Sequence, residues 1–122
     1  MGEDAQSPTV LVVDDDPSLR LLCRVNLELE GYHVLEAGTV PEAQAMLVGD
    51  GVDLVLLDVH IGPESGLELM RAVRDEGGAP PVVLVTGSAR LDAETQAEAD
   101  GVVTKPFRLE ELLGVVRTLL TR

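Results

Sequence analysis

The sequence predicts an α/β protein with an open, doubly wound parallel sheet of five strands and helices on both faces. Two observations support this. Short apolar runs alternate with amphipathic segments along the whole chain, in the order of five successive β-then-α units. Three of the runs are almost wholly apolar, which is typical of strands buried on both faces of a parallel sheet.

The five strands are expected where the apolar runs stand in the sequence: 9–13, 32–36, 53–57, 81–85 and 101–104. The second run delivers only Glu36 and Ala37 at its carboxyl end, which suits a peripheral position. With only 2% aromatic residues, the core between the strands and helices must be built from Val, Leu and Ala.

Five helices are expected between and after the strands. The first begins at Pro17 with Asp16 as its N-cap and ends before Gly31. The second covers about 40–48 and is closed by Gly49.

The third helix opens at Ser65 with a capping-box pattern and ends near Gly77. The fourth, about 90–99, is short. The last has the clearest helical periodicity, shown by Leu109, Leu112, Leu113, Val116, Leu119 and Leu120.

Length and composition indicate one domain. A chain of 122 residues can bury its own core. Residues 1–8 are interpreted as a polar N-terminal tail and 9–122 as the domain. No output domain is expected within these residues.

Charge and cysteine content exclude several functions. Nine basic and 22 acidic residues give a net charge of −13, which argues against binding nucleic acid or an anionic membrane. The single cysteine, Cys23, excludes an internal disulfide and a cysteine-based metal cluster, and its apolar surroundings indicate core packing. No signal peptide or membrane span is recognisable, so we expect a cytoplasmic protein.

Polar side chains collect where the predicted strands end. In a parallel sheet of this kind, ligands bind beyond the carboxyl ends of the strands. Those ends are followed by Asp14, Asp15 and Asp16 (strand one), Asp58 (three), Thr86 (four) and Lys105 (five). Asp16 stands directly before Pro17 and is interpreted as the helix cap.

The remaining residues have the chemistry of a phosphoryl-transfer site. Close carboxylates repel one another unless a cation lies between them. All-oxygen ligation without a His or Cys cluster favours a hard ion, and Mg²⁺ fits best. With a lysine and a threonine hydroxyl nearby, a free carboxylate can act as the nucleophile and form an aspartyl phosphate.

Four motifs together resemble the receiver domain of two-component response regulators. They are VLVVDDD, DLVLLD with SGLEL shortly after it, VVLVTGSA and VTKPF, in that order, and the resemblance runs from about residue 9 to 121. It implies a flavodoxin-like, chemotaxis-regulator-like fold with strand order 2-1-3-4-5.

The resemblance also implies a role for each residue of the acidic group. Asp58 would be the phosphoacceptor and also a Mg²⁺ ligand. Asp15 would bind Mg²⁺ directly and Asp14 mainly through water. The backbone carbonyl of His60, rather than its side chain, would complete the protein ligands.

The other implied roles concern the phosphoryl group and the partners. Lys105 would contact the phosphoryl group, Thr86 would move to hydrogen-bond it, and the Lys105–Pro106 peptide would be cis. A sensor histidine kinase or a phosphotransfer protein would donate the phosphoryl group, and an unknown downstream protein would respond to it. Beyond its own phosphorylation and dephosphorylation, no substrate turnover is expected.

The loop after Asp58 departs from the family pattern. That loop usually reads Met-Pro-Gly and then Asp-Gly, whereas this chain has Ile-Gly-Pro-Glu-Ser-Gly over residues 61–66. Proline and glycine have exchanged places, so the loop is expected to take a different path. Ser65 stands in place of the Asp and is expected to cap the following helix equally well.

Further departures fall on the face formed by the fourth helix, fifth strand and fifth helix. Val102 stands where the family often has a Tyr or Phe, so coupling through ring rotation cannot operate. The segment from Thr86 to Lys105 is about one helical turn short. Arg108 opens the last helix where Asp or Ser is usual, which removes a cap.

Three alternative functions are weighed at the level of sequence, and the last two fit the residues poorly. A receiver-fold interaction module that works without phosphorylation fits the altered loop and the missing aromatic. A haloacid-dehalogenase-type phosphatase would need a DxD arrangement and a cap, neither of which fits. A flavodoxin-like FMN site would place phosphate beside three aspartates, which repel it.

Overall fold

A computed structural model describes residues 7–75, 79–87 and 91–121. Its main sheet has five parallel strands in the order β2-β1-β3-β6-β7. Counted along the chain without the short hairpin, this is the predicted order 2-1-3-4-5. The strands are β1 (Thr9–Val13), β2 (His33–Ala37), β3 (Leu54–Asp58), β6 (Val82–Thr86) and β7 (Gly101–Thr104).

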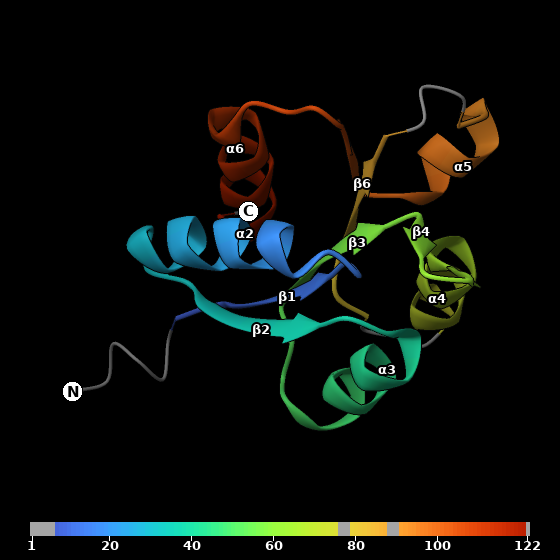
Figure 1. Cartoon of the computed structure of the whole chain (residues 1–122), viewed down its shortest axis with the longest axis horizontal. Coiled ribbons are helices and arrows are strands. Elements are labelled where there is room, and N and C mark those ends of the chain that lie inside the picture. The colour runs from blue at the N-terminus through green and yellow to red at the C-terminus, as the bar shows by residue number, and fades with distance from the viewer. Residues whose placement is uncertain (1–6, 76–78, 88–90, 122) are drawn as a thin grey trace.

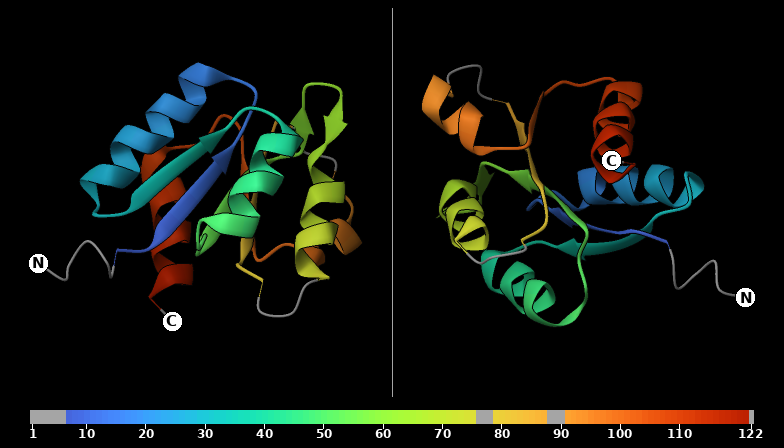
Figure 2. Two further views of the ribbon diagram at one scale, coloured as in Figure 1. Left: turned by 90° about the horizontal axis from the view of Figure 1, so that it is seen from below. Right: turned by 180° about the vertical axis from the view of Figure 1, so that it is seen from behind.

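Helices cover both faces of this sheet (Figures 1 and 2). They are α2 (Pro17–Leu29), α3 (Val40–Gly49), α4 (Gly66–Arg74), α5 (Ala93–Glu98) and α6 (Leu109–Leu120). The helices α2 and α6 pack on one face, and α3, α4 and the short α5 lie on the other. None of the helices in the described part of the chain has the length and apolarity needed to cross a bilayer.

The strands are apolar throughout because alternate residues enter two separate cores. Val10 and Val12 of β1 pack with the helices α2 and α6. Leu11 and Val13 pack with α3 and α4 on the opposite face. All four side chains are buried. The same alternation along β3 and β6 holds the carboxyl ends of the central strands in a fixed position.

Three predicted strands are displaced by one residue. The strands β2, β3 and β6 each begin and end one position later than expected. The ladder continues one residue further because Asp58 pairs with Val85 and Thr86 pairs with Thr104. Asp58 and Thr86 are therefore the last residues of their strands rather than the first residues of loops.

The helix boundaries were predicted well, with three differences. Gly49 does not close α3; it is the last helical residue, and the positive φ of 63° falls on Gly51 instead. The third predicted helix ends at Arg74 rather than near Gly77, which lies outside the described residues. The start of the fourth, at residue 90, also lies outside them, and α5 begins at Ala93.

A two-stranded hairpin that the sequence did not predict follows β3. Its strands are β4 (His60–Ile61) and β5 (Glu64–Ser65), paired antiparallel and joined by Gly62 and Pro63. The buried side chain of Ile61 fixes this β4–β5 hairpin to the core beside α4.

Three predictions concern the N-caps of helices, and the structure tests each of them. The Asp16 carboxylate accepts a hydrogen bond from the Ser18 amide at 2.9 Å, which confirms it as the cap of α2. Ser65 occupies the N-cap position of α4, but the expected side-chain cap is wrong, since its side chain makes no capping hydrogen bond. The predicted missing side-chain cap at Arg108 is confirmed.

We expect Asp16→Ala to lower the free energy of unfolding by about 1 kcal/mol, because an amide of the first turn of α2 loses its acceptor. Ser65→Ala is the matched control and should change it by less than about 0.5 kcal/mol. Urea unfolding followed by circular dichroism in EDTA measures both. Equal losses in the two variants would contradict this assignment of caps.

Candidate functional site

The carboxyl ends of the central strands bring the predicted site residues to one edge of the sheet. Asp14 follows β1, Asp58 ends β3 and Thr86 ends β6. Lys105 follows β7, and its backbone amide donates to the Thr86 carbonyl at 2.7 Å. The Lys105–Pro106 peptide is cis, as the resemblance implied.

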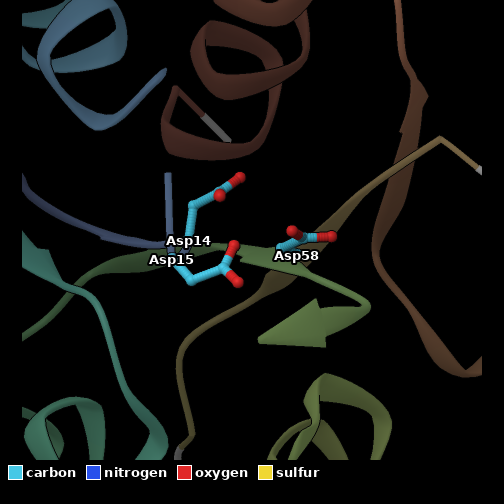
Figure 3. Close-up of side chains that lie close together, drawn as sticks. All are labelled: Asp14, Asp15 and Asp58. Atoms are coloured by element: carbon cyan, nitrogen blue, oxygen red, sulfur yellow. The ribbon is translucent and has the colours of Figure 1, made fainter. Parts of the chain in front are cut away.

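Asp14, Asp15 and Asp58 form a carboxylate cluster (Figure 3). Their ligand oxygens all lie within 4.8 Å of one another. Asp14 and Asp58 are buried, whereas Asp15 is exposed and opens the cluster to solvent. Oxygen donors of this kind, reachable from water, suit Mg²⁺, which uses one or two carboxylates and keeps several other oxygen ligands.

The surroundings of Asp14 disfavour its ionised form. Burial raises its pKa, and the nearby charge of Asp58 adds to the effect. Hydrogen bonds from the Asp16 amide at 2.9 Å and from the Lys105 ammonium at 3.1 Å act in the opposite direction but do not cancel it. The ionised carboxylate is therefore held at a cost that a bound cation would relieve.

We expect Asp14→Asn to stabilise the metal-free protein at neutral pH. Because the pKa of Asp14 is raised by folding, its ionisation costs stability above that pKa, and the cost disappears as the pH falls through it. Asparagine keeps an oxygen for the Asp16 amide and carries no charge.

Thermal melts in EDTA should give Asp14→Asn a higher Tm than the wild type at neutral pH, with the difference shrinking at acidic pH. Added Mg²⁺ should raise the Tm of the wild type by mass action and leave that of the variant nearly unchanged. A variant that melts below the wild type at neutral pH would contradict the expected repulsion.

Lys105 supplies the cation of the metal-free site. Its ammonium lies 3.1 Å from Asp14 Oδ2 and 3.5 Å from Asp58 Oδ2. Burial lowers the pKa of this ammonium, but the hydrogen bond to Asp14 and the charges of Asp14 and Asp58 outweigh it and raise the pKa above its usual value. The side chain is therefore fully protonated at neutral pH.

Thr86 and His60 lie at the same edge of the sheet as the cluster. Thr86 is buried at the end of β6. The His60 amide donates to Asp58 Oδ1 at 3.3 Å, while its side chain is exposed. This backbone contact places the main chain of His60 next to the Asp58 carboxylate.

Cys23 is buried against β1 and α6, as the apolar pattern predicted. Burial raises the pKa of its thiol to about 11, with smaller contributions from nearby charges. The thiol is thus unreactive at neutral pH and serves packing.

Sequence reasoning missed two groups that hold the acidic turn in place. The Arg20 guanidinium donates to the Asp14 carbonyl at 2.6 Å and pairs with Glu36 at 3.3 Å. The Gly62 amide donates to Asp15 Oδ2 at 2.9 Å. The available signal for the turn that presents this amide was Gly62 followed by Pro63, since glycine is typical of the first position of a type II′ hairpin turn.

The fold and this site define a doubly wound α/β domain that has a carboxylate cluster suited to Mg²⁺ and a lysine in contact with that cluster. A family model for the response regulator receiver domain matches residues 10–117. The chain therefore belongs to the response regulator receiver domain family, which functions in two-component signalling.

Individual relatives agree with this membership. The chain is 38% identical over 122 residues to the probable transcriptional regulatory protein TcrX of Mycobacterium tuberculosis, with 98% of this chain and 52% of TcrX covered. It thus spans about half the length of the curated relatives it matches.

Solved structures agree as well. TrrA of Thermotoga maritima in complex with Mg²⁺-BeF is 33% identical with a TM-score of 0.83, covering 92% of this chain and 98% of that one. TrrA has also been solved with the histidine kinase ThkA; there the identity is 34% and the TM-score 0.82, with 93% and 98% covered. The predicted cofactor, Mg²⁺, is thus the ion bound by a structural relative at 33% identity.

Proposed function

We propose that this domain is a phosphorylation-dependent switch in which Asp58 accepts the phosphoryl group. The observation that carries the proposal is the position of this carboxylate at the end of β3. Its ligand oxygen lies within 4.8 Å of those of Asp14 and Asp15, and the Lys105 ammonium lies 3.5 Å from Asp58 Oδ2. A nucleophile with a metal-binding pair and a cation beside it matches the needs of phosphoryl transfer.

Each residue then has a defined task. Asp15 would bind Mg²⁺ directly and Asp14 mainly through water, and the Asp58 carboxylate and the His60 carbonyl would supply the remaining protein oxygens. When bound, Mg²⁺ offsets the negative charge of the transferring phosphoryl oxygens. Lys105 moves from Asp58 to a phosphoryl oxygen, and the Thr86 hydroxyl donates to another.

The transfer itself needs no proton from the acceptor. A carboxylate oxygen of Asp58 forms a bond to phosphorus while the bond between phosphorus and the donor atom breaks, and the donor leaves with that electron pair. The product is an acyl phosphate, and hydrolysis by water returns the carboxylate and inorganic phosphate. The domain therefore catalyses only its own phosphorylation and dephosphorylation.

The donor is proposed to be a sensor histidine kinase or a phosphotransfer protein, by similarity to TrrA, which was solved with the kinase ThkA. The location is accordingly proposed to be the cytoplasm. A downstream protein is proposed to bind the phosphorylated state. With a net charge of −13, nucleic acid is not proposed as a direct partner of this domain.

Incubation with Mg²⁺ and acetyl phosphate, followed by intact mass measurement, tests the proposal. The wild type should gain the mass of one phosphoryl group, and Asp58→Asn should gain none. Asp53→Asn, directly before the first residue of the same strand, is the matched control and should be phosphorylated like the wild type. Phosphorylation that persists in Asp58→Asn would refute the assignment.

A second candidate, an interaction module independent of phosphorylation, has one observation in its favour. Val102 packs against the core beside β6, where the family often has an aromatic switch residue, so ring rotation cannot report the phosphorylated state. If this candidate is right, Asp58→Asn will bind the downstream partner as the wild type does under phosphorylating conditions.

A further inference from the structure

The β4–β5 hairpin requires glycine and proline in the order found in this chain. The pairs His60–Ser65 and Ile61–Glu64 leave two residues, Gly62 and Pro63, to make the turn. Two-residue hairpin turns are types I′ and II′. Gly62 has a φ of 59°, and the proline ring fixes a negative φ at the next position, so the turn is of the II′ kind.

This order places a hydrogen-bond donor where the usual family order has none. Receiver domains commonly have proline before glycine in this loop, and proline carries no N–H. Here the first of the two residues is Gly62, and its amide donates to Asp15 Oδ2 at 2.9 Å. The exchange of the two residues therefore adds a donor aimed at a metal-binding carboxylate.

The hairpin holds this amide in a fixed position. The Gly66 amide donates to the Val59 carbonyl at 2.7 Å, which closes the base of the loop. The Glu64 carboxylate accepts from the Val40 amide at 3.4 Å and ties the hairpin to α3, while the Ile61 side chain is buried. The amide thus reaches Asp15 from a scaffold anchored on both sides.

Asp15 needs such support more than its two neighbours. Asp14 and Asp58 are buried and contact the Lys105 ammonium, whereas Asp15 is exposed. Without a partner, its carboxylate would rotate away from the two others because like charges repel. With one oxygen held by Gly62, its ligand oxygen stays within 4.8 Å of theirs.

We propose that Gly62 is a positioning residue for the magnesium site, acting through its backbone amide on Asp15. The inference rests on the proposed function, since it requires Asp15 to be a metal ligand. A carboxylate ordered before the ion arrives loses less conformational freedom on binding. Metal binding and the closed hairpin therefore favour each other.

Isothermal titration calorimetry with Mg²⁺ alone tests this inference on three variants of the whole chain. The double exchange Gly62→Pro with Pro63→Gly restores the usual family order and removes the donor. Its Mg²⁺ dissociation constant should rise about three- to tenfold, the effect of having to immobilise one more side chain when the ion binds. Gly62→Asn keeps the N–H at a position where asparagine tolerates positive φ and a Cβ meets nothing within 4 Å. Pro63→Ala also keeps it, and both should stay within about twofold of the wild type.

An NMR measurement on the metal-free protein gives a readout independent of metal binding. The amide proton of residue 62 should resonate downfield and exchange slowly in the wild type. In Asp15→Ala it should move upfield and exchange faster, while the amide of residue 66, bonded to the Val59 carbonyl, should keep its protection.

The outcomes separate the inference from the function on which it rests. If the wild type binds no Mg²⁺, the proposed metal site fails. If the wild type binds Mg²⁺ and the double exchange binds it equally well or more tightly, the positioning role of Gly62 is refuted. Should the double exchange unfold, an unchanged amide of residue 62 in Asp15→Ala would refute the role by itself.

Discussion

Gly66→Ala is expected to destabilise the protein by roughly 2–4 kcal/mol and to suppress phosphorylation of Asp58. A Cβ built on Gly66 would lie 2.0 Å from the Asp58 carbonyl oxygen and 3.2 Å from the Val59 Cα. These are backbone atoms, so no side-chain rotation can relieve the overlap. The helix α4 and the end of β3 must therefore move apart, which also breaks the bond between the Gly66 amide and the Val59 carbonyl.

The loss of phosphorylation follows from that displacement. A shift of about 1 Å in a reacting group can cost on the order of 100-fold in rate. Intact mass measurements over time follow the formation of the acyl phosphate from acetyl phosphate and so give this rate. They are made at a temperature where the variant remains folded. Urea unfolding measures the stability loss.

Gly114→Ala is the matched control for the same substitution. Gly114 lies in the middle of α6, and a Cβ there would meet nothing within 4 Å. Alanine in a helix interior is more favourable than glycine by about 0.5–1 kcal/mol, so this variant should be as stable as the wild type or more stable. Wild-type stability and phosphorylation in Gly66→Ala would show that the loop does not depend on this close approach.

The sequence allowed the sheet and the site edge to be predicted because their signals are local. Each strand is a short apolar run, and the residue that follows it must emerge at the carboxyl edge when all strands are parallel. Asp14, Asp58 and Lys105 were assigned in this way, and the structure brings them together. The predicted bounds of three strands were wrong by one residue, but this did not affect the site, because Asp58 and Thr86 still lie at the carboxyl edge of the sheet.

The hairpin and its consequences were missed because they depend on contacts between distant residues. Gly62 and Asp15 are 47 positions apart, and the sequence of neither segment predicts the hydrogen bond between them. The same applies to Gly66, whose contact with the Asp58 carbonyl appears only when α4 is packed on the sheet. Ser65 was expected to cap α4 with its side chain because its sequence pattern suits a cap; it takes the N-cap position, yet its side chain makes no capping hydrogen bond.

Lys105→Met is expected to slow phosphorylation while strengthening Mg²⁺ binding, two effects of opposite sign. The ammonium contacts Asp14 and Asp58 in the metal-free site, so it competes with the ion for the same oxygens. Methionine removes this competition and the attraction of the lysine for the phosphoryl group together. The rate of phosphorylation by acetyl phosphate should fall by roughly 100-fold, the usual effect of removing one charge-stabilising donor.

The metal-free variant should also be less stable, because three close carboxylates then face one another without a cation. Calorimetric Mg²⁺ titration, initial phosphorylation rates and urea unfolding in EDTA report the three effects separately. Arg108→Met is the matched control: Arg108 is exposed, and it forms no ion pair within the part of the chain that the structure describes. It should leave the rate and the Mg²⁺ affinity unchanged.

Lys105 is the only lysine in the sequence, so its protonation can be followed without interference. Reductive methylation with ¹³C-formaldehyde would label this amine and the N-terminus alone. The methyl resonance of Lys105 should report a pKa above that of a free lysine in the metal-free protein, since the hydrogen bond to Asp14 and the two carboxylate charges outweigh burial. Mg²⁺ should lower that pKa toward its usual value, because the ion takes over the carboxylates that hold the proton. A pKa indifferent to Mg²⁺, or a Lys105→Met variant that binds the ion more weakly, would show that lysine and metal do not share these oxygens.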